Sequence, residues 1–236
     1  MPDRSSSATR RPSVVAIVFD LDGTLIDSAP DIGSALNSLL AERGRAPLAL
    51  MTIRTMIGDG STELVRRAFA ATGAGLSDDQ LSEAVRRYVD LYAAHPVSSG
   101  CVYPGVHETL RALAAAGVRL GLCTNKPSRV VAGVLPALGL ASYFGVVCGG
   151  DTLSARKPDG APLLWVLDRL GLPSVEAPGR AAMVGDGRND VLSARAAGVP
   201  VIAVSYGYSR VPAVELGADV VISHFSQLRE ALERLP

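Results

Sequence analysis

The sequence predicts an α/β fold, in which a doubly wound (Rossmann-like) parallel sheet forms the core and carries an inserted α-helical cap. Two observations lead to this prediction. Short apolar runs rich in β-branched residues alternate with segments that can form helices, and the stretch 27–100 contains helical patterns only. With 48% hydrophobic residues, the chain of 236 residues can bury the core that such a fold requires.

The run VVAIVF at 14–19 is the first predicted strand, and its composition is typical of a strand buried on both faces. Five comparable runs follow it, at 118–123, 145–149, 181–185, 200–204 and 219–222. The segments between the runs predict helices, among them 106–116, 162–170, 189–197 and 227–235. In a parallel sheet wound in this way, ligands bind at the carboxyl ends of the strands.

The inserted stretch predicts three helices, which cover 29–43, 61–71 and 77–94. In the third helix, apolar side chains recur at the spacing of one helix face, namely Leu81, Val85, Tyr88 and Tyr92. We therefore expect the chain to have three parts. They are a disordered tail at 1–13, an α/β core made of 14–26 and 101–236, and a helical cap at 27–100.

The composition excludes several classes of protein. The 23 basic and 23 acidic residues balance, and no basic run appears, so we expect no nucleic acid partner. No apolar stretch is long enough to span a membrane, and the first thirteen residues lack the apolar segment of a secretory signal. The 3 cysteines suit neither a disulfide framework nor a zinc pair, so we expect a reducing compartment and a cytoplasmic location. We therefore expect the partner to be a small molecule, and we expect the protein to be a monomer or a homodimer.

Polar clusters follow the first four predicted strands in turn. They are Asp20, Asp22 and Gly23 after the first, Thr124 and Asn125 after the second, Lys157 after the third, and Asp186 and Asp190 after the fourth. Carboxylates crowded at one sheet edge repel each other unless a hard cation lies between them, and oxygen ligands point to Mg²⁺. A metal, a fixed ammonium and positioned donors are what phosphoryl transfer requires. Two carboxylates add a nucleophile and an acid–base group.

These motifs resemble those of the haloacid dehalogenase superfamily of phosphohydrolases over almost the whole chain. DLDGTLIDS is similar to its first motif, CTNKP to its second, ARKPDGAPL to its third and VGDGRNDVLSARAAG to its fourth. The helical insert is similar to the cap of the family. The runs IGDGSTELVRRAF, YPGVHETLRAL and SYGY are most similar to bacterial phosphoglycolate phosphatases. The third motif has Asp-Gly where relatives often have a second proline, and the fourth has Gly187 where many have Ser, but no catalytic group is missing.

The resemblance implies a function for each cluster. Asp20 would be the nucleophile that becomes an aspartyl phosphate, and Asp22 the acid and base. Mg²⁺ would be bound by the Asp20 carboxylate, the Asp22 carbonyl and Asp186, while Asp190 would order a metal-bound water or Lys157. The remaining predicted contacts are with phosphoryl oxygens, from Thr124, Asn125 and Lys157. The implied substrate is a small phosphate monoester, 2-phosphoglycolate in first place.

Other functions stay open on the sequence. A phosphomutase similar to β-phosphoglucomutase has the same catalytic residues, and a pyrophosphatase is a further alternative. A non-enzymatic phospho-receiver domain is the most distant alternative, since a receiver lacks a cap and needs no second carboxylate.

Two basic residues outside the four clusters, Arg67 and Lys126, bear on the substrate. We interpret Arg67 as the cap residue that could meet a substrate carboxylate bidentately, with the backbone amides near Gly60 and Ser61 as the alternative. Asp59, which lies in the Gly-Asp-Gly turn with Gly60, argues against an anionic substrate because its charge is negative. Lys126 and Lys157 are the only lysines of the chain, and we interpret Lys126 as a solvated surface lysine.

Overall fold

A six-stranded parallel sheet forms the centre of the molecule, with the strand order β3-β2-β1-β4-β5-β6. The computed structural model describes residues 14–97, 101–177 and 179–236, so the predicted tail at 1–13 lies outside the described residues. The strands are β1 (Ala16–Phe19), β2 (Arg119–Cys123), β3 (Val146–Cys148), β4 (Ala181–Gly185), β5 (Val201–Val204) and β6 (Val220–Ile222). Each lies within its predicted run, and the predicted doubly wound α/β class is confirmed.

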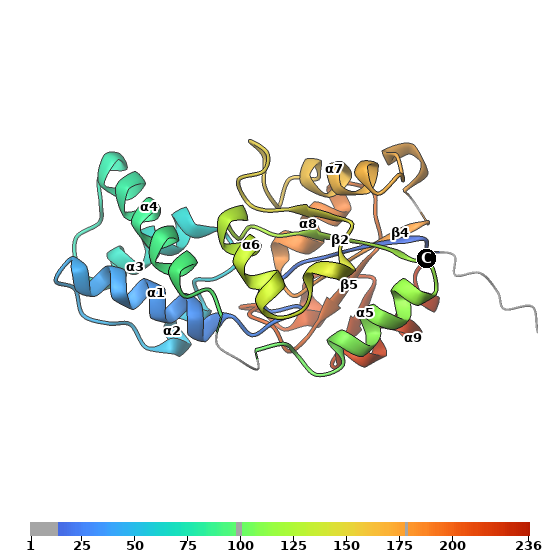
Figure 1. The fold of residues 1–236 in the computed structure, drawn as a ribbon, viewed down its shortest axis with the longest axis horizontal. Coiled ribbons are helices and arrows are strands. Elements are labelled where there is room, and N and C mark those ends of the chain that lie inside the picture. Colours follow the sequence, from blue (N-terminus) through green and yellow to red (C-terminus); the bar gives the residue numbers. More distant parts are fainter. Residues whose placement is uncertain (1–13, 98–100, 178) are drawn as a thin grey trace, which may run out of the picture.

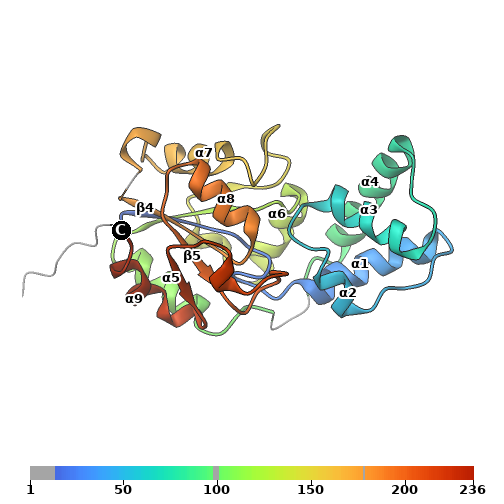
Figure 2. The same cartoon turned by 180° about the vertical axis from the view of Figure 1, so that it is seen from behind.

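Helices cover both faces of the sheet (Figures 1 and 2). The helices of the core are α5 (Val106–Ala115), α6 (Ser128–Ala137), α7 (Ala161–Arg169), α8 (Arg188–Ala196) and α9 (Leu228–Glu233). Short 3-10 turns lie at Ala141–Tyr143, Ser174–Glu176, Ala213–Glu215 and Phe225–Gln227. Alternate side chains of β1 explain the two layers: Ile17 and Phe19 pack with α5, α6 and α9, whereas Ala16 and Val18 pack with α7 and α8. Both faces of β1 are therefore apolar, as its composition predicts.

The chain between β1 and α5 forms a group of helices at one end of the molecule (Figure 1). They are α1 (Ala29–Glu42), α2 (Leu50–Arg54), α3 (Ser61–Thr72) and α4 (Asp78–Ala94). The predicted apolar face of α4 packs inward, with Leu81, Tyr88 and Tyr92 buried, and a capping box between Ser77 and Gln80 begins this helix. Helix α2 was not predicted, because its five residues are too few to show a periodic pattern. None of the described helices combines the length and the apolarity that a membrane crossing requires.

The strand order places the ends of β1 and β4 side by side at the centre of the sheet. The chain winds outward in opposite directions from these two strands, which makes their carboxyl ends the switch point where such folds bind ligands. The N–H of Asp20 continues the pairing past the end of β1 by donating to the Val184 carbonyl at 2.9 Å. Residues that follow β1 and β4 are thus brought together although they are far apart in sequence.

Candidate active site

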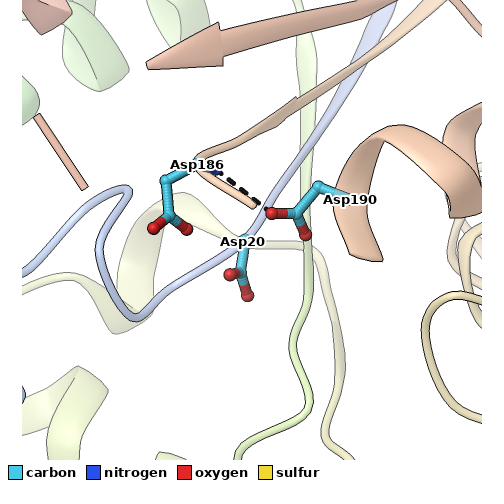
Figure 3. A group of neighbouring side chains, drawn as sticks. All are labelled: Asp20, Asp186 and Asp190. Carbon is cyan, nitrogen blue, oxygen red and sulfur yellow. Dashed lines mark hydrogen bonds between the residues drawn. The ribbon is translucent and has the colours of Figure 1, made fainter. Parts of the chain in front are cut away.

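Three carboxylates meet at the carboxyl ends of β1 and β4 (Figure 3). Asp20 follows β1, Asp186 follows β4, and Asp190 lies in the first turn of α8. Each offers an oxygen, and these oxygens lie within 4.8 Å of one another. All three residues are buried, so their charges are poorly screened by water. The structure therefore joins three of the predicted site residues in one group.

Two glycines make room for Asp186. A Cβ at Gly23, which has a φ of 82°, would lie 2.4 Å from Asp186 Oδ2, and a Cβ at Gly207 would lie 2.2 Å from Asp186 Cβ. Any larger residue at either position would displace the carboxylate. The N–H of Tyr208 donates to Asp186 Oδ2 at 2.6 Å, which fixes its orientation.

Lys157 lies among these carboxylates and is itself buried. Its Nζ is 2.8 Å from Asp20 Oδ1 and 2.6 Å from Asp190 Oδ1. The other oxygen of Asp190 accepts the N–H of Asp186 at 3.1 Å (Figure 3) and the N–H of Gly187 at 2.9 Å. Both oxygens of Asp190 are thus engaged, so this residue orients Lys157 and leaves Asp20 and Asp186 as the freer oxygen donors.

The charges of this group do not balance without a further cation. Burial raises the pKa of Asp20 to about 6, and the nearby Asp190 carboxylate adds to the effect, although Lys157 opposes it. Burial, together with the negative charges of Asp190 and Asp20, also raises the pKa of Asp186 well above its usual range. Burial opposes the charged form of Lys157, but Asp190 and Asp20 outweigh it and raise its pKa. An oxygen-only group with surplus negative charge fits a hard divalent cation.

Thr124 and Asn125 follow β2 and are both buried beside this group. The Asn125 amide donates to the carbonyls of Gly58 and Lys157, each at 3.0 Å, so its two side-chain hydrogens are engaged. Its backbone N–H has no hydrogen-bond partner in the described part of the chain. The Asn125 side chain therefore ties the loop at Gly58 to the core, and a phosphate contact of Asn125 stays a prediction, for its backbone N–H alone.

Lys126 does not lie at the surface, so its interpretation as a solvated lysine is wrong. The residue is 5% exposed, and its Nζ donates to Asp22 Oδ1 at 2.7 Å and to the Tyr92 hydroxyl at 2.6 Å. The carboxylate compensates the buried ammonium, and Tyr92 of α4 covers it from the cap side with its ring centroid 4.3 Å from Nζ. Ser28 also donates to Asp22 Oδ1, at 2.6 Å. The one signal in the sequence is that Lys126 and Lys157 are its only lysines.

Arg67 is not brought to this group. Its guanidinium pairs with Asp59 Oδ2 at 2.5 Å and donates to the Met56 carbonyl at 3.1 Å. Asp59 in turn accepts a hydrogen bond of 2.7 Å from Asn189, a core residue that the sequence reasoning missed. The acidic residue that the sequence placed beside Arg67 therefore neutralises it and links it to the core.

Two adjoining cavities share Asp20 and Asp22 in their walls. The first has a volume of about 50 Å³ and lies between the helical insert and the core. Its wall is formed by Asp20, Asp22, Ile32, Ile57, Gly58, Gly60, Ser61, Leu64, Tyr88, Tyr92, Thr124, Asn125, Lys126 and Pro127. The second measures about 280 Å³ and is lined by Lys157, Asp186 and Asp190, among others. Of the described residues that line these cavities, none is Arg67.

Known proteins are similar to this chain over most of its length. A family model of haloacid dehalogenase-like hydrolases matches residues 14–198. A protein named phosphoglycolate phosphatase from Rhodospirillum rubrum is 49% identical over 221 residues, which cover 92% of this chain and 90% of that protein. One of the same name from Agrobacterium fabrum is 41% identical over 224 residues, covering 95% and 94%.

The fold agrees with these sequence matches. The crystal structure of a predicted phosphoglycolate phosphatase from Haemophilus somnus 129PT superposes with a TM-score of 0.85 at 31% identity, covering 93% of this chain and 98% of that one. Family match, sequence identity and fold all extend over most of the chain. The chain therefore belongs to the haloacid dehalogenase-like hydrolase family.

Proposed function

We propose that this hydrolase is a Mg²⁺-dependent phosphatase that hydrolyses a small phosphate monoester, 2-phosphoglycolate in first place, through an aspartyl phosphate on Asp20. The observation that carries the proposal is the position of Lys157. Its ammonium is 2.8 Å from Asp20 Oδ1 and is held by Asp190, which places a fixed positive charge beside a buried nucleophile. A phosphoryl group bound at Asp20 would share that charge.

Oxygen atoms of this chain fit a resident Mg²⁺. The residues that would hold it are Asp20 and Asp186 through their carboxylates and Asp22 through its backbone carbonyl. The raised pKa values of Asp20 and Asp186 support this assignment. Burial and mutual repulsion destabilise the two ionised carboxylates, and a bound cation would stabilise them. The metal supplies charge neutralisation for the carboxylates and for the phosphoryl oxygens.

In the first half of the reaction, an Asp20 oxygen attacks phosphorus and forms a new P–O bond. The bond from phosphorus to the ester oxygen breaks, and the ester oxygen takes the electron pair and a proton from Asp22. Lys157, the Thr124 hydroxyl and the Asn125 backbone N–H hold the phosphoryl oxygens meanwhile. The developing negative charge is thus met by donors that are already in place.

In the second half, Asp22 accepts a proton from a water molecule, and the water oxygen attacks phosphorus. The bond from phosphorus to Asp20 breaks, its electron pair returns to the Asp20 carboxylate, and inorganic phosphate is released. Asp22 is protonated again, so both carboxylates recover their starting states. The part 27–100 would act as a cap that keeps other water away from the aspartyl phosphate.

The first cavity has room for a small substrate. It is the smaller of the two cavities at Asp20, and its volume of about 50 Å³ corresponds to roughly three to five water molecules, enough for a two-carbon tail. The names of the relatives from Rhodospirillum rubrum and Agrobacterium fabrum agree with phosphoglycolate. We also propose a cytoplasmic location, since Cys101, Cys123 and Cys148 are all free thiols.

The test is turnover across a panel of phosphate esters with Mg²⁺ present, with phosphoglycolate, pyrophosphate and hexose phosphates included. We expect phosphoglycolate to have the highest kcat/KM and to yield glycolate and inorganic phosphate in equal amounts. A higher value for pyrophosphate would contradict the substrate assignment. Isomerisation of a hexose phosphate without release of phosphate would identify a mutase instead.

A further inference from the structure

We propose that Lys126 binds the carboxylate of the substrate and thereby sets the preference of the enzyme for esters with an anionic tail. This inference rests on the proposed phosphatase function and names the substrate class that the site selects. It assigns to Lys126 the contact that the sequence suggested for Arg67.

Lys126 lies where the tail of a bound ester would reach. It lines the first cavity together with Asp20 and Asp22, so its ammonium and the proposed nucleophile face the same small space. Among the described residues that line this cavity, Lys126 is the only one with a cationic side chain, because Lys157 lines the second cavity. An ester with its phosphorus at Asp20 would therefore meet one positive side chain at its other end.

The ammonium has a hydrogen-bond donor to spare. It carries three N–H groups, of which Asp22 Oδ1 and the Tyr92 hydroxyl accept two, at 2.7 and 2.6 Å. Tyr92 is 1% exposed and belongs to α4, so it holds the ammonium in place from the cap side. None of the described residues accepts the third N–H, which leaves it for a ligand, and burial of the ammonium strengthens its contact with a carboxylate.

The helical insert contributes a second wall of suitable polarity. Gly60 and Ser61, at the start of the twelve-residue α3, line the same cavity as Lys126. Gly60 offers no side chain to cap the helix, so the first N–H groups of α3 have no side-chain acceptor at the N-cap. A carboxylate between Lys126 and these groups would be attracted by the ammonium and by the helix dipole.

Arg67 is the other basic residue considered for the contact with the substrate carboxylate, and its contacts do not favour that role. Its guanidinium is neutralised by Asp59 at 2.5 Å, and it lines neither cavity. Lys126 is also paired, with Asp22, but its partner lines the cavity too, so the ammonium can serve both carboxylates at once.

Because Lys126 also contacts the proposed acid Asp22, the test must separate substrate recognition from general catalysis. We suggest measuring kcat/KM for phosphoglycolate and for 2-hydroxyethyl phosphate, in which a neutral hydroxymethyl group replaces the carboxylate. Any effect of the substitution on Asp22 is common to both esters and cancels in the ratio of the two values. The ratio therefore reports recognition of the carboxylate alone.

In Lys126→Met we expect this ratio to fall about tenfold or more, since a charge-assisted contact with a carboxylate is lost. Lys126→Gln should show the same fall, and its amide can still donate to Asp22 and Tyr92, which guards against failure to fold. Arg67→Ala is the matched control and should keep the ratio of the wild type.

The outcomes distinguish the inference from the function on which it rests. If the wild type shows no preference for phosphoglycolate, the proposed substrate and the inference both fall. If the wild type prefers phosphoglycolate and folded Lys126→Gln keeps that preference, the inference alone is overturned. If Arg67→Ala lost the preference for phosphoglycolate and the Lys126 variants kept it, the substrate carboxylate would be bound by Arg67 and the inference would be wrong.

Discussion

Replacing Asp20 by Asn should stabilise the protein in the absence of metal. Burial and the nearby carboxylates raise the pKa of Asp20 from 3.8 to about 6, which means that its ionised form is held at a cost in the folded state. The folded state binds this proton more tightly than the unfolded chain does. The free energy of unfolding of the wild type therefore falls, relative to that of Asp20→Asn, as pH rises from about 4 to about 6.

The expected magnitude follows from the same two values. The difference between the variant and the wild type should be close to zero well below pH 4 and should level off above pH 7 at up to roughly 3 kcal/mol. Urea unfolding in excess chelator, followed by circular dichroism at several pH values, measures this difference. Adding Mg²⁺ at pH 8 should reverse the order, because the wild type gains the binding free energy and the variant has lost a ligand.

Asp151 provides a control of opposite sign. It is exposed, and although desolvation opposes its ionised form, the Ser128 hydroxyl and N–H donate to it and lower its pKa, so Asp151→Asn should lose stability at neutral pH. The reasoning would be refuted if Asp20→Asn were less stable than the wild type in chelator at pH 8. A Mg²⁺ stabilisation that is equal in both proteins would refute it as well.

Three further predictions concern the metal, the acid and the glycines of the site. Chelation should abolish turnover and Mg²⁺ should restore it, whereas Ca²⁺ should restore it poorly because its coordination is looser; full turnover in excess chelator would contradict the metal site. Asp22→Asn should slow esters with poor leaving groups far more than activated aryl phosphates, since only the former need a proton, and equal losses on both would exclude the acid function. Gly207→Ala should raise the Mg²⁺ concentration for half-maximal activity severalfold, because its Cβ would lie 2.2 Å from Asp186 Cβ. Gly75→Ala is the matched control and should leave that concentration unchanged, because a Cβ there would have none of the described atoms of other residues within 4 Å, apart from its chain neighbours.

The strands and the edge that carries the carboxylates follow from the sequence alone. A β-branched run such as that of β1 is recognisable because burial on both faces leaves no polar positions in it. The parallel order then brings Asp20 and Asp186 together, since each comes directly after its strand. These features depend on local pattern and on general rules of topology.

The surroundings of Asp22 do not follow in the same way. The buried ammonium of Lys126 contacts Tyr92 of α4, and no local pattern reveals a contact between residues 34 positions apart. Arg67 was interpreted from its place on a helix, and its pairing with Asp59 depends on how the turn before α3 bends back. Contacts between single side chains of the helical insert and of the core depend on how the two parts pack together, which no local sequence pattern predicts.

The central claim is that Asp20 carries the phosphoryl group during turnover. A single turnover of an activated aryl phosphate by Asp22→Asn, which needs no acid to form the aspartyl phosphate but lacks the base that hydrolyses it, can be quenched with acid and reduced with borohydride. Peptide mass spectrometry should then find homoserine at position 20, the product of reducing an aspartyl phosphate. Phosphate released during that turnover without any modified Asp20, or the modification on another residue, would contradict the account.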